Sequence, residues 1–466
     1  MKIHRIAGGA VIVMALTLFA CSPRKAAPPE GGKPRDFKIP EVKTFTLENG
    51  LGVSMIRYGS VPKASIRFVI RAGSINEAPD QVWIADMAAD FLKEGTVART
   101  AKEIAEASAS MGGEISAGAG SDTSSLSGTV LSEFVPDFLS LLADMLKNPK
   151  FPESELGRIR ANYLRRLALA KSEPSSLASD GFFHVLYGDH PYGRTFPSES
   201  RIQSYTIATI KKFYAENYGA RRTHLYIAGV FDERKAEQAI REALKDWKAG
   251  NEMVTNVPAP KSARKVHVLD RPGSVQSTIL LGLPVIPPAH EDFIALEVAD
   301  TLLGGAFASR ITSNIRENKG YTYSPTSAII RRYKDACWYE QADVATNVTG
   351  AALKEIFFEI DRLKNEAPAE AELKGIKNLF SGTFILQNST PNGIIGILNY
   401  LRLNELGKDY LSTYIRNVFK VTPAEIQKIV ADRLRGGDMT IFIVGDYEKI
   451  KDQVAVYGEV IKEESK

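Results

Sequence analysis

The sequence predicts an α+β protein that contains two homologous domains. After residue 43, segments with strand-like alternation and segments with helical periodicity are interspersed along the chain. The stretch LYIAGVFDERKAEQAI (225–240) also aligns with IFIVGDYEKIKDQVAV (441–456), at an offset of 216 residues. Each copy reads as a buried strand, a glycine turn and an acid-rich helix start. A repeat this long indicates duplicated domains, because solenoid repeats have periods of about 20–50 residues.

Length and composition are typical of a globular protein. The chain has 466 residues, of which 44% are hydrophobic and 24% charged, and this length suits two to three domains. The net charge is +4, and Lys2 and Arg5 contribute two of these charges. A chain starting at Cys21 is therefore close to neutral, which argues against a nucleic-acid partner. The two cysteines, Cys21 and Cys337, do not make a disulfide framework.

The N-terminus predicts export and attachment to a membrane. Residues 1–20 combine a basic start with a short apolar core, as in a secretory signal peptide. They end in Leu-Phe-Ala before Cys21, which resembles the bacterial lipobox and implies a lipid on Cys21. The plain alternative is a signal peptide with an incidental cysteine. By the same resemblance, Ser22 rather than an aspartate favours the outer membrane, facing the periplasm, if the cell is Gram-negative. Residues 21–42 are rich in proline, glycine and charge and are expected to form a flexible tether.

The first domain is expected at residues 43–248. The Asn49-Gly50 pair predicts a hairpin turn within 44–56, and alternation or apolar runs predict the other strands. Further strands are predicted at 64–72, 114–120, 123–131 and 223–230. Helices are predicted at 82–92, 101–111, 134–146, 153–170, 174–186, 205–218 and 234–247.

Residues 249–264 are expected to form a linker, and the second domain is expected at 265–466. The linker contains proline, glycine and asparagine, and strand and helix patterns resume after it. Strands are predicted at 265–269, 276–283, 321–330, 336–345 and 439–444, the last as the closing strand. Helices are predicted at 292–303, 309–318, 351–363, 369–386 and 393–406.

One segment, LLGGAFASRITSNIRENKGYTY (302–323), carries a candidate site. It predicts a helix that ends at Gly320 and a strand that opens at Tyr321. Arg316 then lies in the last helical turn and Tyr323 at the start of the strand. The intervening turn can direct a guanidinium and a phenol toward one oxygen atom. The plain alternative is a surface arginine beside a half-buried tyrosine.

The GG, SRI, IREN, KG and YTYS elements of this segment resemble the C-terminal domain of the pitrilysin/insulinase family of zinc metallopeptidases. The likeness is greatest to the two-domain branch that includes the mitochondrial processing peptidase. It implies two domains, each with a mostly antiparallel sheet packed with helices. It also implies that Arg316 and Tyr323 help to bind the substrate and the tetrahedral intermediate. RAGSINE (71–77), GGEISAG (112–118) and HPYG (190–193) resemble family sequences too, with His190 as a structural residue. In active members the second of these includes the edge strand that receives the substrate.

The family's zinc motif is replaced in this chain. Active members carry H-x-x-E-H on a helix and a downstream glutamate. The matching stretch here, ADMAADFLKEGT (85–96), places Asp86 and Asp90 at the histidine positions and Ala89 at the glutamate position. The downstream ligand position falls on Arg166, or on Arg165 with a shift of one. No two histidines after Cys21 are spaced i, i+4. Asp86 and Asp90 could hold a hard cation weakly, but an Asp–Arg ion pair is favoured over any metal.

The resemblance therefore implies a zinc-less, non-catalytic subunit. It would supply Arg316 and Tyr323 to a homologous partner that carries H-x-x-E-H, and the pair would cleave peptides or unfolded proteins in the bacterial cell envelope. Zinc is then expected in the partner and no cofactor in this chain. The alternative is a purely structural or peptide-binding lipoprotein of the same fold. A hydrolase with another nucleophile is disfavoured, because no Ser-His-acid or Cys-His signature exists and Cys337 reads as a buried strand residue.

Overall fold

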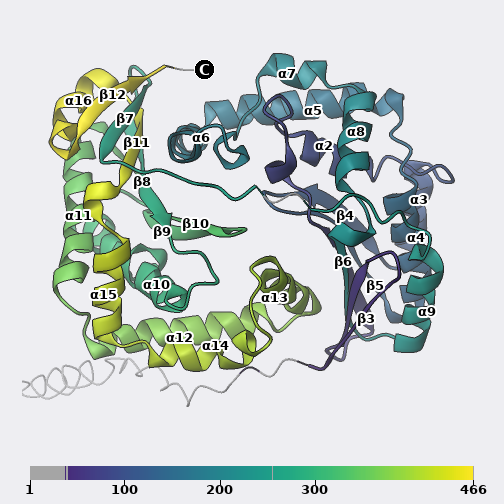
Figure 1. The fold of residues 1–466 in the computed structure, drawn as a ribbon. Coiled ribbons are helices and arrows are strands. Elements are labelled where there is room, and N and C mark those ends of the chain that lie inside the picture. The colour runs from purple at the N-terminus through teal and green to yellow at the C-terminus, as the bar shows by residue number, and fades with distance from the viewer. Residues whose placement is uncertain (1–36, 38–39, 254–255, 465–466) are drawn as a thin grey trace, which may run out of the picture. The chain divides into compact units, whose positions relative to one another are not determined.

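The computed structural model describes residue 37 and residues 40–253 and 256–464 (Figure 1). The predicted signal peptide, Cys21 and most of the predicted tether lie outside these residues. Within the described ranges the chain forms two six-stranded sheets, each with its own hydrophobic core. None of the helices described there is both long enough and apolar enough to cross a bilayer.

The first sheet has the strand order β1-β2-β6-β3-β5-β4. β2 and β6 are parallel, and every other neighbouring pair is antiparallel. The predicted turn between the first two strands is present, and Gly50 there has a φ of +92°, which glycine adopts without strain. The strands are β1 (Val42–Thr46), β2 (Gly52–Arg57), β3 (Lys63–Ile70), β4 (Glu114–Ala119), β5 (Ser124–Leu131) and β6 (Thr223–Gly229).

The second sheet repeats five of these strands. Its order is β12-β7-β11-β8-β10-β9, and β7 is parallel to both β11 and β12. The series β7-β11-β8-β10-β9 matches β2-β6-β3-β5-β4 in order and direction, which is the duplication that the sequence repeat predicts. The strands are β7 (Lys265–Asp270), β8 (Gln276–Val285), β9 (Thr326–Arg332), β10 (Asp335–Ala345), β11 (Thr440–Gly445) and β12 (Glu459–Glu463).

The sixth strand differs between the two sheets. In the first sheet it is β1, which precedes the repeated unit, and in the second it is β12, which follows it. The prediction that 439–444 is the closing strand is therefore wrong. β11 occupies that stretch in the sheet interior, and β12 closes the edge as a short, partly exposed strand with a weak sequence signal.

Helices cover the sheets and complete the cores. Those of the first half are α2 (Ile84–Phe91), α3 (Ala101–Ser110), α4 (Val135–Lys147), α5 (Glu153–Ser172), α6 (Pro174–Tyr187), α7 (Glu199–Ser204), α8 (Ile207–Asn217) and α9 (Glu233–Leu244). Those of the second half are α10 (Phe293–Asp300), α11 (Thr349–Asn365), α12 (Glu370–Gln387), α13 (Pro391–Leu403), α14 (Asp409–Lys420), α15 (Pro423–Arg433) and α16 (Tyr447–Val454). α7, α14 and α15 are additions to the predicted helices. The TPAE capping box at Thr422–Glu425 is a signal that predicts α15.

Each half also contributes a helix to the other half's sheet. α6 packs on β8 and β11, where Phe182 and Phe442 belong to one buried cluster. The approach is so close that a Cβ on Gly181 would lie 1.9 Å from the Phe442 ring. In return, α13 packs on β3 and β6 through Ile394 and Ile395.

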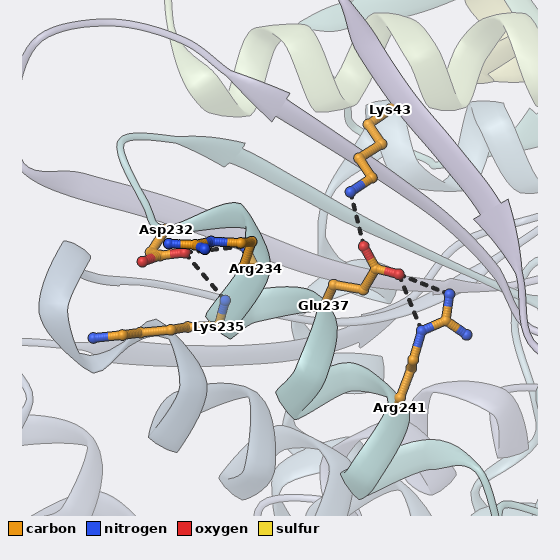
Figure 2. Close-up of polar contacts among 6 residues, drawn as sticks. All are labelled: Lys43, Asp232, Arg234, Lys235, Glu237 and Arg241. Atoms are coloured by element: carbon orange, nitrogen blue, oxygen red, sulfur yellow. Dashed lines mark hydrogen bonds and ion pairs between the residues drawn. The ribbon is translucent and has the colours of Figure 1, made fainter.

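A charged cluster fastens the edge strand β1 to α9 (Figure 2). Lys43 Nζ lies 2.8 Å from Glu237 Oε2, and Arg241 Nη2 lies 2.7 Å from Glu237 Oε1. Asp232 caps α9 by accepting hydrogen bonds from the backbone N–H groups of Arg234 and Lys235. Pairing with Lys43 and Arg241 lowers the pKa of Glu237. Lys43 places a charge on the edge strand β1, and charges on an edge strand disfavour pairing with another chain.

Candidate functional site

The start of α2 fixes the positions that correspond to the zinc motif. Glu77 Oε2 accepts a hydrogen bond from the Trp83 N–H at 3.1 Å, and Oε1 accepts one from the Ala85 N–H at 2.9 Å. Burial raises the pKa of Glu77 to about 8, although these N–H groups act in the opposite direction. Glu77 ends the RAGSINE stretch, so part of this family-like sequence serves to anchor α2.

An ion pair links α2 to α5 at the predicted metal positions. Arg166 Nη1 lies 3.0 Å from Asp86 Oδ1, and the Arg166 guanidinium also lies 4.4 Å from the ring centroid of Trp83. The Tyr163 hydroxyl donates to Asp90 Oδ2 at 2.8 Å, and Lys93 Nζ lies 3.2 Å from Asp90 Oδ1. This is the Asp–Arg ion pair that the sequence predicts. The Asp90 carboxylate is also engaged, by the Tyr163 hydroxyl and the Lys93 ammonium group.

These residues do not fit a zinc ion. A zinc site needs neutral imidazoles, thiolates or free carboxylates and an open position for water. Here the Asp86 carboxylate is engaged by a cation, and the buried Ala89 has no group that could act as a base. Burial raises the pKa of Asp86, while Arg166 acts against that rise. Within the described ranges no three histidine, cysteine or acidic residues are placed to hold a metal. These positions therefore provide neither a zinc site nor a base for hydrolysis.

The structure brings Arg316 and Tyr323 together. Arg316 lies in the π-helical segment η6 (Thr312–Asn318), and Gly320 just after it has a φ of +65°. The Arg316 Cζ atom lies 4.9 Å from the ring centroid of Tyr323 and 4.3 Å from that of Phe307. Both rings are largely exposed, Tyr323 to 80% and Phe307 to 71%. Two exposed aromatic rings therefore hold one guanidinium, an arrangement that cation–π attraction favours.

The details differ from the prediction in two ways. Tyr323 does not begin a strand, because β9 starts at Thr326, and only Thr322 forms an isolated bridge, with Val344. Pro325 explains the late start, since proline lacks an N–H donor and restricts the residue before it. Second, the guanidinium lies over the tyrosine ring and its Nε atom lies 3.1 Å from Glu317, so the two donors do not converge on one point in this conformation.

The loop before η6 packs closely on strands β9 and β10. The π-helical segment η5 (Thr301–Gly305) precedes Phe307, and a Cβ on Gly304 would lie 2.6 Å from both Glu340 Oε2 and Ser327 Oγ. Asp300 accepts hydrogen bonds from Ser327 and from Trp338 Nε1, and burial raises the pKa of Asp300 to about 6. Gly304 thus allows the loop that carries Phe307 to lie directly on β9 and β10. The sequence did not identify Phe307, which lies two residues after the Gly304-Gly305 break, because contacts distant in the sequence set the loop conformation that brings it to Arg316.

Three other predicted features have clear positions. β4, which begins within GGEISAG, lies at the edge of the first sheet. His190 Nδ1 accepts a hydrogen bond from the Tyr192 N–H at 3.2 Å, so His190 shapes a turn. Cys337 is fully buried in β10, as predicted, and burial raises the pKa of its thiol.

Comparison with known proteins agrees with this architecture. The family model described as insulinase (peptidase family M16) matches residues 54–197, and the model described as peptidase M16 inactive domain matches residues 204–380. This chain belongs to the peptidase M16 family. The M16 models span strands of both sheets and include Asp86, Arg166, Arg316 and Tyr323.

Relatives and solved structures extend the likeness over most of the chain. An uncharacterized zinc protease of Streptomyces coelicolor is 24% identical over 90% of this chain and 92% of its own length. One from Rickettsia felis is 25% identical over 83% and 90%. Among solved structures, a peptidase M16 inactive domain from Pseudomonas fluorescens has a TM-score of 0.81 at 24% identity, covering 87% of this chain and 98% of its own. A protease from Helicobacter pylori also has a TM-score of 0.81, at 20% identity and 88% and 100% coverage. The solved structures establish the shared M16 fold.

Proposed function

We propose that this chain is a non-catalytic, substrate-binding subunit of an M16 peptidase in the cell envelope. One contrast carries the proposal. At the zinc-motif positions Arg166 is paired with Asp86, whereas Arg316 and Tyr323 are close together with an exposed phenol. An arginine at a metal-ligand position opposes metal binding, but it does not affect a distant pair of hydrogen-bond donors. Membership of the M16 family supports a role for this chain beside a peptidase.

The partner is a homologous M16 chain that carries H-x-x-E-H and binds zinc. Arg316 and Tyr323 of this chain would donate hydrogen bonds to a carbonyl oxygen of the peptide that the partner cleaves. Donors aimed at developing negative charge contribute about 2.7–4 kcal/mol each in other enzymes, or about 10²–10³ in rate. For both donors to reach one oxygen, the guanidinium must move off the Tyr323 ring, and the exposure of both rings leaves room for that movement.

A lipid on Cys21 would hold the complex at the membrane, in the outer membrane facing the periplasm. The basis is the lipobox-like sequence before Cys21 together with Ser22. A lipid-anchored protein needs no spanning helix, because acyl chains supply the membrane affinity.

The test is reconstitution with the H-x-x-E-H chain encoded nearest to this one. Each chain alone should show little cleavage of a peptide library, and the mixture should be active. Tyr323→Phe should lower kcat, and Arg316→Ala should lower kcat and raise KM, because its guanidinium also holds substrate. The doubly substituted chain should lose less than the product of the two single losses if both groups act on one oxygen.

Arg241→Ala is the matched control, since Arg241 also lies over an aromatic ring, that of Phe45, but in the first half. It should leave activity unchanged. Full activity of the reconstituted pair with Arg316→Ala and Tyr323→Phe combined would refute the proposal. The alternative, a structural or peptide-binding lipoprotein, would then be preferred.

A further inference from the structure

A cavity of about 720 Å³ lies in the second half, among α10, α12, α13 and α14. One face of α13 packs on the first half's sheet through Ile394 and Ile395, and another face, with Gly396 and Tyr400, lines this cavity. Phe307 also lines it, and the same ring contacts the Arg316 guanidinium. The cavity is therefore continuous with the surface formed by Phe307, Arg316 and Tyr323.

The duplication relates the helices that line the cavity, α12 and α13, to α5 and α6 of the first half. α6 and α13 begin at Pro174 and Pro391, which are 217 residues apart. The same spacing aligns Arg166 of α5 with Thr383 of α12, and Thr383 lines the cavity. The second half thus has an open space beside the position that Arg166 occupies in the first half. Small side chains on α12 and α13, including Thr383 and Gly396, leave this space open.

The charges that line the cavity balance each other. Glu297 of α10 is buried and accepts a hydrogen bond from Arg331 of β9, and the Tyr414 hydroxyl lies 3.4 Å from its second oxygen. This pair is neutral overall. A ligand carboxylate would be repelled by Glu297, and a ligand cation would be repelled by Arg331. An ionic ligand therefore gains little here.

Six aromatic rings line the cavity together with small, aliphatic and amide side chains. The rings of Phe384 and Tyr414 are stacked with centroids 4.6 Å apart, and those of Tyr410 and Tyr414 are 5.6 Å apart. The Tyr400 hydroxyl is buried and makes no hydrogen bond of ordinary length within the described residues, and its nearest polar interaction is with Tyr410. Mostly apolar walls with a few polar groups are typical of sites for small organic groups, and aromatic walls favour aromatic guests.

We propose that this cavity binds an aromatic side chain of an extended peptide, with the Tyr400 hydroxyl as a hydrogen-bond partner inside. The volume exceeds that of one side chain, so the adjoining backbone enters as well. The inference deepens the proposed function by naming the substrate class: peptides with an aromatic residue near the carbonyl that Arg316 and Tyr323 would contact. Its test uses this chain alone, so its outcome is separate from that of the reconstitution.

The experiment measures peptide binding to the full chain by isothermal titration calorimetry and saturation-transfer NMR. The probes are acetyl-Ala-Ala-X-Ala-Ala-amide with X as tyrosine, phenylalanine, alanine, aspartate or lysine. We expect the tyrosine and phenylalanine peptides to bind at least tenfold more tightly than the other three. Tyr400→Phe should weaken the tyrosine peptide more than the phenylalanine peptide, because it removes the hydroxyl and keeps the ring.

Gly396→Phe fills the cavity and should lower affinity for the aromatic peptides at least tenfold. A Cβ at Gly396 meets no atom within 4 Å, so the backbone there has room for the first atom of a side chain. Gly375→Phe is the control, since Gly375 is also an unobstructed helical glycine but does not line the cavity. Thermal unfolding verifies that both variants fold.

Three results would overturn the proposal. The first is equal or tighter binding of the alanine, aspartate or lysine peptide. The second is unchanged aromatic binding in folded Gly396→Phe. The third is binding that appears only after residues 22–36 are deleted, which would make the chain's own N-terminal segment the occupant; Phe37 already lies 5.4 Å from Phe384 between ring centroids.

Discussion

Replacing Arg166 with methionine should destabilise the first half by an amount that depends on Asp86. Methionine keeps an apolar side chain over the Trp83 ring and removes only the charge and its hydrogen bond. The variant then leaves the Asp86 carboxylate, whose side chain is 23% exposed, without its cation. Asp86→Ala in the same chain removes that carboxylate, so the doubly substituted chain should recover part of the lost stability.

The distance and exposure set the size of the effect. Two unit charges about 4 Å apart near a protein surface interact by about 4 kcal/mol before desolvation and entropy are counted. The Arg166 side chain is 52% exposed, so solvent screens much of this energy. Exposed pairs give about 0.2–1 kcal/mol in double-mutant cycles, and breaking a buried pair costs about 3–5 kcal/mol. For this intermediate case we expect a coupling energy of about 1–2 kcal/mol.

The effect should also depend on pH. Burial raises the pKa of Asp86 and Arg166 opposes the rise, so Arg166→Met should raise it further. A carboxyl with a higher pKa in the folded state binds more protons when folded, and stability therefore falls as pH rises past its unfolded value of about 3.9. Arg166→Met should cost more at pH 7 than at pH 4. Urea unfolding of the four chains at both pH values measures this. A coupling energy below about 0.3 kcal/mol, or equal losses at the two pH values, would refute the reasoning.

Three further predictions concern metal, location and a buried histidine. The chain without residues 1–21 should hold no stoichiometric zinc by elemental analysis; one tightly bound zinc per chain, lost on replacing Asp86 and Asp90, would contradict the site described above. Cys21→Ala should leave the membrane fraction or remain an uncleaved precursor, and unchanged processing and fractionation would count against a lipid anchor. Burial lowers the pKa of His224 to about 3, so the unfolded chain takes up a proton below about pH 6.5 that the folded chain does not. Acid should therefore cost up to about 1.4 kcal/mol per pH unit through this residue, and His224→Gln should flatten the dependence in unfolding measurements at pH 4.5 and 6.5; an unaltered slope would show that other groups cause it.

Local sequence signals predicted most of the secondary structure. Pro174 at the first turn of α6 and the alternation of β10 are such signals, and both elements lie within about one residue of their predicted bounds. β12 was not predicted, because a five-residue edge strand is specified mainly by its parallel neighbour β7, which lies far away in sequence. β9 starts at Thr326 rather than at Tyr321, because Pro325 cannot donate a backbone hydrogen bond to a sheet.

The candidate sites were predictable where the family resemblance or the chain's own spacing carried the information. The resemblance placed Asp86 and Arg166 at the positions of two zinc ligands, and the two residues meet across α2 and α5. Phe307 joins Arg316 through a fold of the loop that sequence spacing does not encode. The cavity was not predicted either, because it depends on four helices and on the absence of side chains at positions such as Gly396.

The exchange of α6 and α13 has a consequence for how this chain holds together. Each sheet buries part of its surface against a helix of the opposite half. Separating the halves would expose Phe182 of α6 and Phe442 of β11 at one contact, and Ile394 of α13 at the other. A cut within residues 249–264 should therefore leave two fragments that remain bound to each other without a covalent link. Expressed separately, each fragment would lack a helix that its sheet needs, and the two should regain native structure only on mixing, by fragment complementation.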